Sequence, residues 1–187
     1  MKKIILIFAI IISQLYFAQE YPLDYKGDVP NNAYYKDLNG ELNKYVGLWK
    51  GGWNGKTIYL ELRKIKTFNS GSSSYYKDRI YGERKIIASN GIVEIDRISN
   101  FDLQDPEFWG MSTNLKNGNI KRMYFYPRNM CRLQATLDIM SFTGTQMTLH
   151  MEYLPNFKDD TCQHNAYIEQ YNDWPINFPK DIVLTKQ

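Results

Sequence analysis

Residues 57–63 read Thr-Ile-Tyr-Leu-Glu-Leu-Arg, an alternation of apolar and amphipathic or polar residues that sets the class of fold. In an extended chain Ile58, Leu60 and Leu62 lie on one face, and the residues between them lie on the other. Such a period of two predicts a β-strand with one buried face.

The same alternation recurs in later segments that are separated by turn sequences such as Asn90-Gly91, Asn117-Gly118 and Thr143-Gly144-Thr145. No long helical pattern lies between these segments, which disfavours a parallel fold of alternating strands and helices. We therefore expect an all-β fold, an antiparallel up-and-down barrel of about 8–10 strands, with a β-sandwich as the alternative. The further strands are expected at residues 76–88, 92–98, 120–126, 132–142, 146–153 and 182–185.

The first 18 residues have the pattern of a secretory signal peptide. Lys2 and Lys3 precede an apolar run that ends at Ala18 and is shorter than the roughly 20 residues of a membrane-spanning helix. We predict cleavage after Ala18, which leaves a secreted or periplasmic protein without a transmembrane segment. Residues 19–36 are expected to form an irregular arm, and residues 37–187 a single barrel domain.

The charge of the chain is nearly balanced. There are 23 Lys and Arg residues against 20 Asp and Glu residues, a net charge of +3. Because two lysines belong to the signal peptide, the exported chain carries 21 basic against 20 acidic residues. No segment concentrates basic residues as phosphate binding requires, so we expect no nucleic-acid partner. Arg79 and Arg84, interleaved with acids such as Glu83, are expected on solvated strand faces.

The two cysteines, Cys131 and Cys162, both lie in the part expected to be exported. In an oxidising compartment they favour one disulfide, with two free thiols as an alternative. The disulfide would close a loop of 32 residues, counting both cysteines, and chain entropy gives it about 3.7 kcal/mol of stabilisation. A metal site that adds His150 and His164 is the other alternative, but Cys162-x-His164 is not a structural zinc spacing. We expect neither a metal nor a cofactor.

No pattern in the sequence indicates catalysis. The two histidines are the only imidazole bases, and His150 with Glu152 is expected to form an ordinary polar strand face. Glu94 and Asp96 share one strand face, whereas the carboxylates of a glycosidase usually come from separate elements. We therefore predict no catalytic residues and a protein that is not an enzyme.

Residues 45–50, Tyr-Val-Gly-Leu-Trp-Lys, open the first expected strand. They resemble the Gly-x-Trp start of the calycin superfamily, which includes lipocalins and fatty-acid-binding proteins. The resemblance implies that Gly47 turns the chain into the strand and that Trp49 plugs the closed end of a barrel. Lys186 stands where such proteins often place an Arg over this Trp, and the Thr-Asp-Tyr signature of many lipocalins is absent.

A second resemblance covers most of the chain. It is carried by Ala18-Gln19, by residues 29–37 (Val-Pro-Asn-Asn-Ala-Tyr-Tyr-Lys-Asp) and by residues 178–187 (Phe-Pro-Lys-Asp-Ile-Val-Leu-Thr-Lys-Gln). Together they resemble a group of uncharacterised small secreted proteins of the Bacteroidota type. This resemblance implies export and brings no assigned activity.

Two functions from different classes are consistent with this sequence. The first is the binding of a small, largely apolar ligand, for which Arg122 with Tyr124 and the apolar Met147 and Met151 are the candidate residues. The second is surface recognition of a protein by a filled barrel, as an inhibitor or an envelope-associated module. Its candidate contacts are the aromatic residues of the arm and of residues 165–174. A cavity above about 300 Å³ with its mouth near residues 154–180 would favour ligand binding.

Overall fold

The computed structural model describes residues 19–71, 73–114, 120–154 and 160–187, which form two compact units. The larger unit, residues 42–65 with 79–187, is a β-barrel. The described part of the smaller unit comprises residues 19–41 and 66–78. β4 (Lys56–Ser70) and β5 (Ser74–Ile87) contribute residues to both units.

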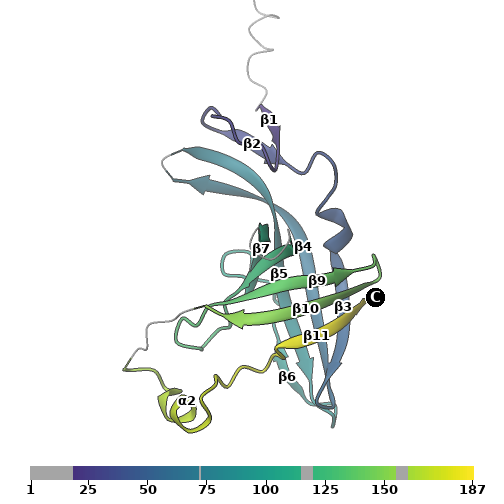
Figure 1. The fold of residues 1–187 in the computed structure, drawn as a ribbon, viewed down its shortest axis with the longest axis vertical. Coiled ribbons are helices and arrows are strands. Elements are labelled where there is room, and N and C mark those ends of the chain that lie inside the picture. Colours follow the sequence, from purple (N-terminus) through teal and green to yellow (C-terminus); the bar gives the residue numbers. More distant parts are fainter. Residues whose placement is uncertain (1–18, 72, 115–119, 155–159) are drawn as a thin grey trace, which may run out of the picture. The chain divides into compact units, whose positions relative to one another are not determined.

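In the described part of the chain, eight strands close the barrel in an antiparallel, up-and-down order. β11 (Asp181–Lys186) pairs with β3 (Gly47–Trp53), and β5 pairs with β7, so the wall has no open edge. Figure 1 shows β3, β11, β10 and β9 side by side. The predicted antiparallel β-barrel is thus confirmed. The other strands are β6 (Val93–Asp96), which pairs with β5 outside this order, and the wall strands β7 (Phe108–Asn114), β8 (Ile120–Phe125), β9 (Ala135–Phe142) and β10 (Gln146–Tyr153).

The alternation in the sequence sets which side chains fill the barrel. Ile58, Leu60 and Leu62 of β4 are fully buried, as their period of two predicted. The expected turns around Gly91 and Gly144 join strands with positive φ at each glycine, whereas Asn117-Gly118 lies outside the described residues. Buried apolar residues from the other wall strands are Ile80, Ile86, Phe108, Met123, Phe125, Ala135, Leu137, Ile139, Met147, Leu149, Met151, Ile182 and Leu184.

One end of the barrel is closed around Trp49. Its indole Nε1 donates to the carbonyl of Tyr45 at 2.8 Å, from the short 3₁₀ helix η2 (Asn43–Tyr45), and its ring lies 6.0 Å from that of Phe142. The ammonium of Lys186 lies 5.3 Å from the Trp49 ring centre. Gly47 has φ +132°, and a Cβ there would lie 3.0 Å from Lys186 Cε. The structure thus gives Gly47 a positive φ and buries Trp49 completely, while the calycin roles of both residues stay predictions.

A charged pair lies buried toward the opposite end of the barrel. Arg84 and Glu107 have only 3% and 2% of their side chains exposed, and Arg84 Nε donates to Glu107 at 2.9 Å. Glu83 is fully buried and pairs with Arg97, and burial raises the pKa of the Glu83 carboxyl against the opposing effect of Arg97. The expectation that Arg84 and Glu83 lie on solvated strand faces was therefore wrong.

The smaller unit is a short sheet rather than an irregular arm. β1 (Glu20–Pro22) pairs in parallel with β2 (Ala33–Lys36), and β2 pairs in parallel with the start of β5. The hydroxyl of Tyr34 donates to the buried Asp78 carboxylate at 2.6 Å, which also accepts the backbone N–H of Asp37. Burial first, and then this hydrogen bond, raise the pKa of Tyr34.

Candidate functional site

Residues 173–180 form a connecting segment that covers the barrel end opposite Trp49. The segment follows the helix α2 (Asn165–Tyr171) and leads into β11. Phe178 is 3% exposed, and its ring lies 5.7 Å from Phe108 and 5.3 Å from Phe125. Since Phe108 and Phe125 stack on each other at 4.4 Å, the three rings fill the interior at this level.

The connecting segment is held in place through Asn177. Arg84 Nη1 donates to the carbonyl oxygen of Asn177 at 2.7 Å, and Lys56 Nζ donates to its side-chain oxygen at 3.0 Å. The amide nitrogen of Asn177 donates to Glu94. The buried charge of Arg84 therefore binds this segment as well as Glu107, which fixes the backbone around Phe178.

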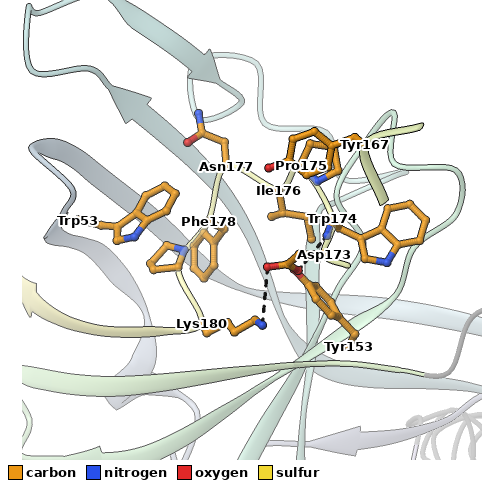
Figure 2. A pocket seen from close by; sticks show the side chains of 11 residues that line it. Trp53, Tyr153, Tyr167, Asp173, Trp174, Pro175, Ile176, Asn177, Phe178 and Lys180 are labelled. Carbon is orange, nitrogen blue, oxygen red and sulfur yellow. Dashed lines mark hydrogen bonds and ion pairs between the residues drawn. The ribbon is translucent and has the colours of Figure 1, made fainter. Parts of the chain in front are cut away.

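A cavity of about 480 Å³ lies beside the connecting segment, and we call it the cup. Figure 2 shows that its side chains come from different parts of the chain: Trp53 ends β3, Tyr153 ends β10 and Tyr167 belongs to α2. Barrel closure brings these ends together, because β3 and β10 both flank β11. The described lining residues are Trp53, Tyr153, Tyr167, Asp173, Trp174, Pro175, Ile176, Asn177, Phe178, Pro179 and Lys180.

Asp173 organises the polar side of the cup. Its Oδ1 accepts the hydroxyl of Tyr153 at 2.9 Å and the backbone N–H of Trp174 at 2.8 Å. Its Oδ2 lies 3.7 Å from Lys180 Nζ, the contact drawn as a dashed line in Figure 2. Burial, and then the hydrogen bond to Asp173, raise the pKa of Tyr153, so this phenol remains a donor at neutral pH.

The disulfide predicted between Cys131 and Cys162 is present, with the two Cα atoms 5.7 Å apart. It ties the chain just before α2 to the segment that precedes β9, so it supports the helix that carries Tyr167. The bond leaves neither cysteine free, which overturns the alternatives of free thiols and of a metal site that uses them. Among the residues that the structure describes, no group of three His, Cys, Asp or Glu side chains is placed to hold a metal.

The four predicted ligand residues divide between the two faces of the barrel wall. Met147 and Met151 are buried at 0% and 3% exposure and pack in the interior. Arg122 and Tyr124 lie on the face of β8 opposite to the buried Met123. None of the four belongs to the described lining of the cup.

Partners within the protein already occupy the Arg122 and Tyr124 side chains. The guanidinium of Arg122 forms two hydrogen bonds with Asp138, one of them from Nη2 at 2.7 Å. The ring of Tyr124 stacks on Trp109 at 5.0 Å. Arg122 and Tyr124 therefore contact side chains of the neighbouring strands on the outer wall. This packing within the sheet explains the Arg-x-Tyr pattern.

Sequence reasoning found part of the cup. The aromatic content of residues 165–174 indicated Tyr167 and Trp174, although as contacts for a protein partner. Trp53, Tyr153 and Asp173 were missed, because they lie far apart in the sequence, at the end of β3, at the end of β10 and in the connecting segment, and only the folded chain brings them together. Two features of the sequence could have indicated them. Trp53 directly precedes a turn, and Tyr153 ends the alternating segment 146–153.

His150 illustrates a polar cluster outside the cup. Its Nδ1 lies 2.7 Å from Asp181 on the neighbouring strand, and its Nε2 lies 3.7 Å from Glu152. The hydrogen bond to Asp181 raises the pKa of His150. All three side chains are exposed by a third or more, so the cluster is a polar outer face, as the sequence predicted.

The chain belongs to DUF6705, a family of unknown function, whose model matches residues 1–187. No curated protein and no solved structure gave a match to the chain. The family assignment therefore agrees with the predicted uncharacterised group and adds no activity to the geometry described above.

Proposed function

We propose that this member of a family of unknown function is an exported barrel that binds a small molecule in the cup. The observation that carries the proposal is the lining itself, where aromatic rings from three separate elements share one cavity with a hydrogen-bonded carboxylate. The cavity volume of about 480 Å³ lies within the range of about 300–1,000 Å³ that small-molecule sites occupy. We also propose that the protein binds this molecule without catalysing a reaction on it.

The cup is a better site than the barrel interior, where a largely apolar ligand was first expected. Phe178 rests on the stacked Phe108 and Phe125 rings, so a ligand entering from this end would have to displace a buried aromatic side chain. Removing such a ring from its packing costs about 3–5 kcal/mol. Binding in the cup requires no such displacement.

A second cavity of about 480 Å³ supports ligand binding less well. One aromatic residue, Tyr126, is among its described lining, together with Arg128 and Arg132. The guanidinium of Arg128 is already paired with Asp102 and Asp105, each at 2.9 Å. An incoming anion would therefore compete with two carboxylates of the protein itself.

Export is the second part of the proposal. The disulfide fits an oxidising compartment, and in the described part of the chain no helix is long and apolar enough to cross a membrane. The signal peptide at residues 1–18 and the cleavage after Ala18 lie outside the described residues. N-terminal sequencing of the protein from a bacterial periplasm or medium tests the cleavage, with Gln19 expected first.

Native mass spectrometry of the protein purified from its own compartment tests small-molecule binding. We expect a retained molecule, or a hit from a fragment library, whose binding is lost in Trp174→Ala. Trp109→Ala is the matched control, because Trp109 lies on the outer wall and stacks on Tyr124. The proposal fails if no molecule or fragment binds, or if both variants lose binding equally while remaining folded.

Surface recognition of a protein remains a second candidate, favoured by the aromatic face of the smaller unit. The rings of Tyr21 and Tyr25 lie 4.7 Å apart, and Tyr35 contacts both Tyr21 and Tyr75. Tyr25 is 41% exposed, and tyrosine is a common anchor in interfaces. A photo-crosslinking residue at position 25 should trap one discrete protein in cells, and a diffuse background of products would remove this candidate.

A further inference from the structure

We infer that the ligand of the cup is a neutral saccharide, bound through stacking of a pyranose ring and through hydrogen bonds to Asp173. This inference rests on the proposed function, since it names the ligand class for the same site. Three properties of the cup lead to it: its aromatic rings, its unused hydrogen-bonding groups and its balanced charge.

The aromatic rings provide flat apolar surfaces next to polar groups. Trp174 follows Asp173 directly, and Tyr153 donates its hydroxyl to that carboxylate, so both residues lie around one acceptor. Tyr167 adds a third ring that is 41% exposed (Figure 2). A pyranose has C–H faces that can stack on such rings, while the hydroxyls at its edge remain available for hydrogen bonds.

The hydrogen-bonding groups that remain unused in the cup are both donors and acceptors. Asp173 Oδ2 makes no hydrogen bond within the described residues, apart from its 3.7 Å contact with Lys180. The indole N–H groups of Trp53 and Trp174 likewise have no acceptor in the part of the chain that the structure describes. A hydroxyl both donates and accepts, so a polyol can satisfy both kinds of group at once.

The charges of the cup favour a neutral ligand. Asp173 and Lys180 are the charged members of its described lining, and they carry opposite signs. An anionic ligand would be repelled by Asp173, and a cationic ligand by Lys180. A ligand without polar groups would cover Oδ2 of Asp173 without giving it a hydrogen bond, which is unfavourable.

A planar aromatic molecule such as indole or phenol is the competing ligand class. Such a molecule would stack on the same rings. Its single polar group could form a hydrogen bond with only some of the unused donors and acceptors of the cup. The two classes therefore predict different effects of replacing Asp173. A saccharide depends on several hydrogen bonds to this side, whereas a stacked aromatic molecule depends mainly on the rings.

The test is titration of the purified exported protein with methyl glycosides of glucose, galactose, mannose and N-acetylglucosamine, and with indole and phenol. Binding is followed by tryptophan fluorescence and by saturation-transfer NMR of the ligand. We expect saturable binding of at least one glycoside and weakening by about 10–100-fold in Asp173→Asn, as for one lost hydrogen bond to a charged group. Asp181→Asn is the matched control, because this exposed carboxylate pairs with His150 outside the cup.

The possible outcomes distinguish the saccharide inference from the proposed small-molecule function. Glycoside binding that Asp173→Asn weakens and Asp181→Asn preserves supports the inference, provided that circular dichroism shows both variants folded. Binding of indole or phenol without any glycoside overturns the saccharide inference and leaves the proposed small-molecule function standing. If Asp173→Asn unfolds, Trp174→Ala replaces it, and unchanged glycoside affinity in that variant contradicts the stacking geometry. Failure of every probe overturns the saccharide inference, whereas the proposed small-molecule function is decided separately by the native mass spectrometry and the fragment library.

Discussion

Loss of the Glu107 carboxylate should destabilise the barrel far more than loss of an exposed charge. Glu107 and Arg84 are almost inaccessible to water, and within the described residues Arg84 has one further acceptor, the carbonyl of Asn177. Glu107→Leu therefore leaves a buried guanidinium without its counter-charge, and we expect a loss of about 3–5 kcal/mol in the free energy of unfolding. For a chain of this size, that corresponds to a decrease of about 6–20 °C in Tm.

The double variant separates the cost of the unpaired charge from the contribution of the pair. In Arg84→Met/Glu107→Leu both charges are absent, and replacement of buried pairs by apolar residues is often neutral or stabilising. We expect the double variant to be more stable than Glu107→Leu by at least about 2 kcal/mol, and together with the single variant Arg84→Met these proteins give the coupling energy of the pair. Lys85→Met is the control on the same strand, since its partly exposed pair with Asp96 should contribute less than about 1 kcal/mol.

Urea titration followed by tryptophan fluorescence provides the measurement, with the disulfide kept oxidised. The reasoning requires a shift of the midpoint without a change in the slope, because the extent of unfolding stays the same. It is refuted if Glu107→Leu costs less than about 1 kcal/mol, or if the double variant is as unstable as the two single losses added together.

Three further predictions concern other parts of the barrel. Removal of the disulfide by Cys131→Ser/Cys162→Ser should lower the free energy of unfolding by about 3–4 kcal/mol, measured by urea titration, and an unchanged midpoint would contradict the chain-entropy account. Gly82→Ala should cost about 1–3 kcal/mol in the same assay, because the new Cβ would lie 2.6 Å from a buried methyl carbon, whereas an unchanged stability would show that the wall can yield. The raised pKa of His150 gives stability that is fully present below its ordinary value of 6.5 and lost as pH rises through the folded pKa. Asp181→Asn should flatten this dependence above pH 6.5, an effect below about 1 kcal/mol at this exposed site, and a steeper profile would contradict the assignment.

The sequence predicted those features that depend on local pattern. The alternation at Ile58, Leu60 and Leu62 determines which face of β4 is buried, since successive side chains of a strand point to opposite sides. Gly144 marked a real turn between β9 and β10, because its positive φ is one that glycine adopts without strain. The pairing of the two cysteines also followed from their number, since two cysteines allow a single intramolecular bond.

Arg84 shows where local pattern was misread. It lies in phase with the buried Ile80 and Ile86 of β5, so the period of two placed it on the inner face, and its charge led to the opposite expectation. A buried arginine is stable only when an acid reaches it. That acid, Glu107, lies 23 residues further along the chain, and its position depends on the pairing of β5 with β7.

The sequence by itself thus predicted most of the barrel strands, the buried face of β4 and the favoured disulfide, because these depend on spacing along the chain. It did not predict β7 or the short strands β1 and β2. Only the tertiary structure determined the cup, since closure of the barrel through β3 and β11 brings Trp53 to the same end as Tyr153 and Asp173. The physical reason is the range of the interactions involved. Alternation and turns act between neighbours in sequence, whereas the cup and the Arg84 pair form between side chains that only the closed wall brings together.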